Sequence, residues 1–136
     1  MDAMRENLSK KQRIVVKVGS STITHEAPGN INFAKLEKLV RLLTDLHNQG
    51  KEVVLVTSGA VAVGRKSIGI KERPKSLSEK QACAAIGQAS LMTVYQKLFS
   101  EYHQPCAQIL MTKFTILNDI TRQNACLNAL INTILS

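Results

Sequence analysis

The sequence predicts an α/β fold built on a parallel, doubly wound sheet. Two short runs, over 13–18 and 52–57, are β-branched and almost continuously apolar, which is typical of parallel strands covered on both faces. A segment of helical periodicity separates them, so the three segments predict a βαβ unit. Helix and strand then continue to alternate, and the full order βαβ(α)αβα favours a parallel, doubly wound sheet.

The composition limits the chain to about one domain. Its 136 residues, of which 44% are hydrophobic, are enough to bury one ordinary core. The net charge of +8 is compatible with nucleic acid, but two Tyr and three Phe offer little stacking surface. No Arg-rich run or nucleic-acid recognition motif is present. Nucleic acid is therefore not the expected partner, and an anionic small substrate explains the charge equally well.

The first residues and the cysteines indicate a cytoplasmic protein. Residues 1–12 are charged and contain no apolar signal-peptide core, so we expect a disordered lead-in, with Met4 as an alternative start. No segment approaches the roughly 18 apolar residues that a membrane span needs. The three cysteines lie in apolar segments without metal-ligand spacing, and we interpret them as reduced core thiols. They are Cys83, Cys106 and Cys126.

The first two strands are expected to be central in the sheet, with an amphipathic helix between them. Apolar residues recur in this helix at helical spacing. They are Phe33, Leu36, Leu39, Val40, Leu43 and Leu46. Asn30 or Asn32 suits the N-cap, and Gly50 suits the C-terminal stop.

Two helices are predicted after the second strand. Small residues following Ser58 fit a short helix that ends near Gly69, and a basic loop marked by proline covers 71–75. A long helix is expected over about 79–102. Ser78 and Gln81 fit a capping box at its start. Three alanines would form a smooth stripe against which a neighbouring element packs closely. They are Ala82, Ala85 and Ala89.

The last segments predict one more strand and one more helix. Pro105 opens an expected strand over 106–111, and Asn118 or Asp119 starts an amphipathic helix. Its apolar positions are Ile120, Leu127, Leu130, Ile131 and Ile134. Because the sequence stops inside this helix without Gly, Pro or a polar cap, we expect the N-terminal part of a truncated, longer α/β protein.

A cation and a glycine loop lie at the end of the first strand, in the segment Lys17-Val18-Gly19-Ser20-Ser21. An α/β sheet usually binds anions at this position. The spacing matches neither GxxxxGK[ST] nor GxGxxG. We therefore predict a compact nest in which amides near Gly19 face a phosphate while Ser20 and Ser21 donate hydroxyls. The alternative for Lys17 is a solvated strand cap.

A second polar glycine loop, Ser58-Gly59-Ala60, follows the second strand. Gly59 permits close backbone approach, and the next helix would aim its N-terminus into the same crevice. The alternative for Ser58 is a plain helix N-cap. It is not an expected nucleophile, since GxSxG and a triad are absent. The histidines lack metal spacing, so no metal ligand is predicted. The two loops predict two walls of one phosphate-handling site.

Three blocks of sequence resemble the amino acid kinase family. They are VVKVGSS, VTSGAVAVG and KQACAAIGQASLM, in that order, and the resemblance runs from about Arg13 to the last residue. It is strongest to the glutamate kinases, because aspartokinases carry a KFGG-like first loop and acetylglutamate kinases a paired glycine. The resemblance implies a three-layer αβα sandwich with a mainly parallel sheet. Residues 13–136 would be its N-terminal, amino-acid-substrate part, without the nucleotide-binding half.

The resemblance also implies ATP-dependent phosphorylation of the side-chain carboxylate of L-glutamate to L-glutamyl 5-phosphate, the first step of proline biosynthesis. A carboxylate is ionised at neutral pH, so the reaction needs positioning and charge neutralisation and no general base. By position, Lys17 would bind the ATP phosphates and stabilise the transition state. Gly19 and Ser20 would contact the γ-phosphate, and Ser58, Gly59 and Ala60 would hold glutamate. Mg²⁺ would bridge the phosphates.

The family's Asn-Glu-Asn-Asp-like segment and nucleoside-binding half are absent from the sequence, so we expect little or no kinase activity from this chain alone. The full-length protein is expected to be a homo-oligomer. Two alternatives stay open: the kinase part of a bifunctional pyrroline-5-carboxylate synthase, and a non-catalytic basic α/β binding module.

Overall fold

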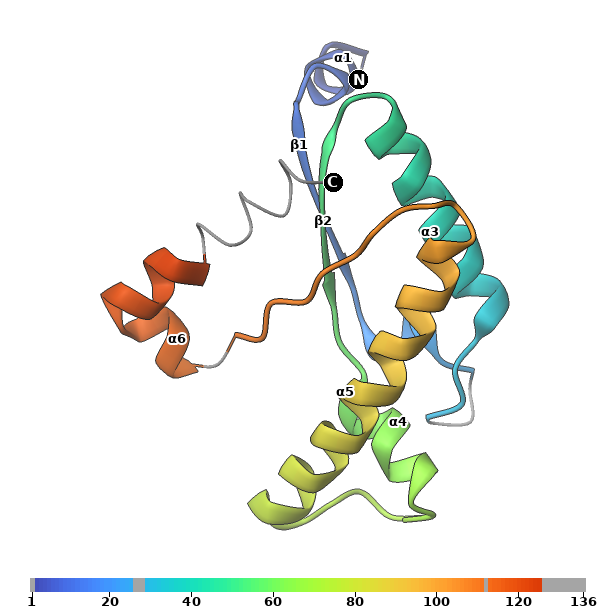
Figure 1. The fold of residues 1–136 in the computed structure, drawn as a ribbon, viewed down its shortest axis with the longest axis vertical. Helices are drawn as coiled ribbons and strands as arrows, with labels where there is room; N and C mark the ends of the chain where they lie inside the picture. Colours follow the sequence, from blue (N-terminus) through green and yellow to red (C-terminus); the bar gives the residue numbers. More distant parts are fainter. Residues whose placement is uncertain (1, 26–28, 112, 126–136) are drawn as a thin grey trace.

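The computed structural model describes residues 2–25, 29–111 and 113–125 (Figure 1). Its elements follow in this order: α1 (Asp2–Ser9), β1 (Arg13–Val18), α2 (Ser20–Ile23), α3 (Phe33–Asn48), β2 (Glu52–Thr57), α4 (Ala60–Ser67), α5 (Leu77–Ser100) and α6 (Lys113–Leu117). The α/β class is therefore confirmed. The α4–α5 hairpin lies at the carboxyl end of the strands, and α1 lies at the opposite end.

The two strands pair in parallel, as the sequence predicts. Their register runs from Arg13 opposite Glu52 to Val18 opposite Thr57. Helix α3 makes the crossover, and the Asn32 side chain caps it by accepting a hydrogen bond from the Lys35 amide at 3.1 Å. The βαβ unit and one of the two proposed N-caps are thus confirmed.

The core lies on one face of this strand pair. Alternate strand residues point to opposite faces, and Val16, Val18 and Leu55 point toward the helices. There they pack with buried side chains of α3 and α5, which lie along the same side of the strands (Figure 1). These helix residues are Leu36, Val40, Leu91 and Tyr95. Burial of this apolar surface holds the strand ends in place.

The expectation that both faces of the strands are covered is wrong for the described residues. Val15 is 61% exposed and Val56 is 44% exposed, because both point away from α3 and α5. The two strands are also not central, since the described sheet contains only this pair. A predicted third strand over 106–111 is not formed: the described part of that segment makes no ladder, and Leu110 is 68% exposed.

The start of α5 lies two residues earlier than the sequence suggested. The capping box uses Ser76 and Glu79, not Ser78 and Gln81: the Ser76 hydroxyl accepts from the Glu79 amide at 3.2 Å, and the Glu79 carboxylate accepts from the Ser76 amide at 3.3 Å. A carboxylate is the stronger acceptor for this return bond. That preference decides the register.

The packed face of α5 also differs from the expected alanine stripe. Its buried residues recur at every fourth position: Cys83, Gly87, Leu91 and Tyr95. The three alanines Ala82, Ala85 and Ala89 are exposed. Glycine permits a closer backbone contact than alanine, and α4 approaches on the glycine side.

The described residues contain two helices that were not expected, α1 and α6. Residues 1–12 were predicted to be disordered, but helix α1 covers Asp2–Ser9, a stretch that contains the helix-favouring residues Met4, Arg5, Glu6 and Leu8. Helix α6 precedes the predicted last helix. The latter is present over 119–125, and the Asn118 side chain caps it by accepting from the Ile120 and Thr121 amides. The expected apolar positions from Leu127 onward, and Cys126, lie outside the described residues.

Candidate functional site

The candidate site lies where β1 and β2 end. Val18 and Thr57 are opposite each other at the last position of the ladder, so the loops that follow leave the sheet side by side. The carboxyl edge of a parallel sheet is where open α/β folds bind ligands. The structure therefore brings together two loops that are about forty residues apart in the sequence.

Direct contacts join these two loops. The Ser58 hydroxyl donates a hydrogen bond to the Val18 carbonyl at 3.3 Å. A methyl group on Gly59 would lie 2.9 Å from Cδ1 of Ile23 and 3.4 Å from Cα of Ser20. Gly59 also has a φ of +108°, which favours glycine. The sequence predicted that the loops form two walls of one site, and the structure confirms that they are adjacent.

Ser58 is not the N-cap of α4. The capping position belongs to Gly59, and no side chain caps the helix. The hydroxyl of Ser58 instead ties the second loop to the end of β1. The side chain is exposed, so it can also reach a ligand over the loops. Ala60, the next residue after Gly59, begins α4.

Lys17 lies one residue before the end of β1 and points to the face of the sheet opposite α3 and α5. Its register partner is Val56, which lies on the same face. The lysine is exposed, and its side chain forms no ion pair or hydrogen bond with any residue in the described part of the chain. Its ammonium is thus available to an anion that approaches the strand end.

The predicted nest around Gly19 is not formed. Gly19 has φ −85° and ψ 167°, an extended conformation, whereas a nest needs successive residues in helical conformations of opposite hand or in a turn. The short helix α2 begins at Ser20 instead. A methyl group on Gly19 would meet no atom within 4 Å, so the surface there is open. Ser20 and Ser21 are both exposed beside it.

Sequence reasoning missed the residues that hold the second loop from behind. The hydroxyls of Thr57 and Tyr95 lie 2.9 Å apart. Tyr95 is 2% exposed, and burial raises the pKa of its phenol. Gly64 and Gly87 bring α4 and α5 into backbone contact. Glycines inside helices are the signal that could have revealed this contact, because they carry a cost that close packing has to offset.

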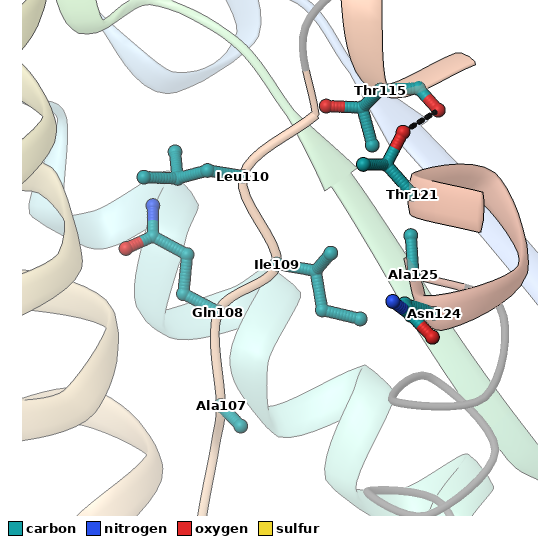
Figure 2. Close-up of a pocket in the computed structure, with 8 residues that line it drawn as sticks. All are labelled: Ala107, Gln108, Ile109, Leu110, Thr115, Thr121, Asn124 and Ala125. Carbon is teal, nitrogen blue, oxygen red and sulfur yellow. Dashed lines mark hydrogen bonds between the residues drawn. The ribbon is translucent and has the colours of Figure 1, made fainter. Parts of the chain in front are cut away.

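Other features of the described residues lie outside this site. An open hollow of about 530 Å³ is lined by residues from 107–110, 115, 121, 124 and 125, none of which is charged or belongs to the predicted site (Figure 2). Within the described ranges, no group of His, Cys, Asp and Glu is suited to hold a metal ion. In the same ranges, no helix has the length and apolar character that crossing a membrane requires.

A parallel βαβ unit with two contacting polar loops at its carboxyl edge is a ligand-binding arrangement of α/β enzymes. The sequence model of the amino acid kinase family matches residues 12–135, and the chain belongs to this family.

Among its relatives are proteins named glutamate 5-kinase. The one from Clostridium perfringens is 46% identical over 123 residues, which cover 90% of this chain and 45% of the relative. The one from Clostridium acetobutylicum is 52% identical over 113 residues, covering 83% and 42%. The one from Carboxydothermus hydrogenoformans is 52% identical over 109 residues, covering 80% and 29%. The chain thus spans less than half the length of each.

Proposed function

We propose that this chain supplies the amino-acid-substrate part, residues 13–136, of an enzyme that phosphorylates the side-chain carboxylate of L-glutamate with ATP. The observation that carries the proposal is the contact between the loop after β1 and the loop after β2, through Ser58 and Gly59. The names of the relatives at 46% and 52% identity support the same substrate.

The proposed chemistry is a direct phosphoryl transfer. A glutamate carboxylate oxygen attacks the γ-phosphorus of ATP, the bond from that phosphorus to the bridging oxygen breaks, and ADP leaves with the electron pair. The carboxylate is already ionised, so no proton has to be removed. The product is L-glutamyl 5-phosphate. Catalysis then depends on alignment of the two substrates and on positive charge near the transferred group.

Each predicted residue receives a role in this proposal. Lys17 neutralises charge on the phosphates, and its lack of a partner among the described residues fits that role. The open surface at Gly19 and the hydroxyl of Ser20 lie where the γ-phosphate would approach. Ser58, Gly59 and Ala60 hold glutamate through the hydroxyl and the first amides of α4.

Mg²⁺ fits this site only as a companion of the nucleotide. The described residues offer no acidic cluster to hold it, while the phosphates of ATP are the ligands that magnesium commonly uses. When bound, the ion would supply further charge neutralisation. We also propose that the reaction is the first step of proline biosynthesis in the cytoplasm and that the full-length protein is a homo-oligomer.

A chimera tests the proposal. The segment of the Clostridium perfringens relative that matches this chain is replaced by this chain, and ADP release from ATP is measured with L-glutamate or L-aspartate. We expect glutamate-dependent release, and a preference over aspartate of about tenfold or more, because one methylene group separates the two substrates. The parent relative is the positive control, and the 136-residue chain alone is expected to show little or no turnover.

A chimera that unfolds cooperatively and yet releases no ADP with glutamate would overturn the proposal. Binding of the chain to a DNA oligonucleotide, weakening steeply with added salt, would then favour the basic binding module.

A further inference from the structure

Two hydroxyls, one from the half-buried Thr57 and one from the buried Tyr95, form a hydrogen-bonded pair behind the candidate site. Thr57 is the last residue of β2, and Tyr95 lies in the second half of α5. Their oxygens are 2.9 Å apart, and Tyr95 is only 2% exposed. Leaving the buried Tyr95 hydroxyl without a hydrogen-bond partner would cost free energy, so the arrangement in which it bonds Thr57 is strongly preferred. The bond therefore fixes the end of β2 relative to α5.

The position of Thr57 makes this bond relevant to the site. Ser58 and Gly59 follow it directly, and Ser58 hydrogen-bonds the Val18 carbonyl. A rotation of the chain at Thr57 would move Ser58 and Gly59, which contact the loop after β1. The hydrogen bond between Thr57 and Tyr95 thus helps to fix the positions of Ser58 and Gly59, and through their contacts the position of the loop after β1.

Tyr95 is itself held by its surroundings. Its ring stacks on Phe99 with centroids 6.5 Å apart and an angle of 27° between the planes. One helical turn before Leu91, Gly87 anchors α5 against the first residue of α4. A phenol is protonated at neutral pH, and burial raises the pKa of Tyr95 further, so its hydroxyl keeps the proton that can be donated to Thr57.

We propose that Tyr95 is a positioning residue, which holds the Ser58–Gly59 loop in the geometry that accepts the amino-acid substrate by its hydrogen bond to Thr57. The proposal rests on the proposed function, since it assigns glutamate to that loop. Tyr95 does not touch substrate; it acts through Thr57. Its effect should therefore fall on glutamate binding more than on ATP binding.

The test compares substitutions that remove single hydroxyls in the chimera. Tyr95→Phe and Thr57→Val should each raise KM for glutamate by about fivefold, the equivalent of one net hydrogen bond, with KM for ATP unchanged. The double variant should resemble either single variant, because the two changes remove the same bond. Thr57→Ser keeps the hydroxyl, so its KM for glutamate should be that of the unsubstituted chimera.

Tyr102→Phe is the matched control. Tyr102 lies just beyond α5 and donates its hydroxyl to Glu37 at 2.6 Å, away from the strand ends. This variant loses a comparable hydrogen bond and should leave both KM values unchanged. An equal rise in KM for glutamate in Tyr102→Phe would show a general effect of stability and would overturn the proposal. So would a Tyr95→Phe variant with unchanged KM for glutamate.

Hydrogen exchange of the chain itself separates this inference from the proposed function. Tyr95→Phe should speed amide exchange over 58–63 by about fivefold relative to the unsubstituted chain, and Tyr102→Phe should not. Faster exchange in the Tyr95→Phe chain, found together with a chimera that does not use glutamate, would keep the positioning role and reject the substrate. Unchanged exchange would reject the positioning role, whatever the activity of the chimera.

Discussion

Gly87 of α5 lies directly against the carbonyl of Ala60, the first residue of α4. A methyl group on Gly87 would come 1.7 Å from that carbonyl oxygen. The contact is reciprocal, because a methyl group on Gly64 of α4 would come 1.8 Å from the carbonyl oxygen of Cys83. Helix α4, which begins at the candidate glutamate loop, therefore packs on α5 through backbone contacts, and at these contacts no side chain separates the two helices.

Gly87→Ala should destabilise the fold by about 3 kcal/mol, because the added methyl meets backbone atoms that cannot rotate away. Urea unfolding followed by circular dichroism measures this loss. Ala85→Gly on the exposed side of the same helix is the control and should cost only the helix propensity of glycine, about 1 kcal/mol. A Gly87→Ala variant as stable as the original chain would show that the helices separate easily.

Lys17→Ala should reduce kcat of the chimera by about 10²- to 10³-fold, the usual effect of losing one group that stabilises transition-state charge. Stability should change by no more than about 0.5 kcal/mol, since the side chain is exposed. Lys38→Ala removes an exposed lysine from α3 and should leave kcat unchanged. Turnover by Lys17→Ala close to that of the unsubstituted chimera would remove Lys17 from the proposed mechanism.

Thr44→Val should raise the free energy of unfolding by about 1 kcal/mol, because the Thr44 hydroxyl is buried and has no hydrogen-bond partner in the part of the chain that the structure describes. Thermal unfolding provides the measurement. Thr24→Val is the matched comparison: that hydroxyl is also buried, but it donates to the Ser20 carbonyl at 2.9 Å, so its loss should be destabilising. Equal effects of the two substitutions would contradict the assignment of partners.

Ser76→Ala should lower stability by about 1 kcal/mol, the usual value of a helix N-cap. Acid should weaken the same cap. Backbone hydrogen bonds from Ser76 and Lys75 hold the pKa of Glu79 below its ordinary value of 4.5. The stability from this carboxylate is therefore present above pH 4.5 and is lost as the pH falls through the lowered pKa. Urea midpoints measured across this range should fall less in Glu79→Gln than in the original chain.

Alkaline pH should destabilise the packing of Tyr95. Burial raises the pKa of its phenol above 10.0, so the folded state holds the proton more tightly than the unfolded chain. The stability from this group is full below pH 10.0 and is lost as the pH rises through the raised pKa. Tyr95→Phe should therefore show a shallower loss of stability with pH in this range. An unchanged slope would mean that the ring is not buried in solution.

The sequence predicted much of the fold where local chemistry decides the outcome. The strands over 13–18 and 52–57 and the helix between them follow from patterns that are read within one segment. The N-cap at Asn32 is a similar case. The adjacency of the Gly19 and Ser58 loops also followed, because parallel strands carry their carboxyl ends to one edge of the sheet. The roles of Lys17 and Ser58 in binding stay predictions.

By itself, then, the sequence determined the βαβ unit, the position of its polar loops and the family. Only the tertiary structure decided which face of each element is buried and what lies behind the site. Valine is a residue type that is usually buried, yet Val15 and Val56 are exposed, because α3 and α5 pack on the other face of the strands. The contact of Gly87 with Ala60 and the bond of Tyr95 to Thr57 join segments that no local pattern relates. Such contacts depend on how neighbouring elements pack against one another, and the propensities of residues within one segment do not specify that packing.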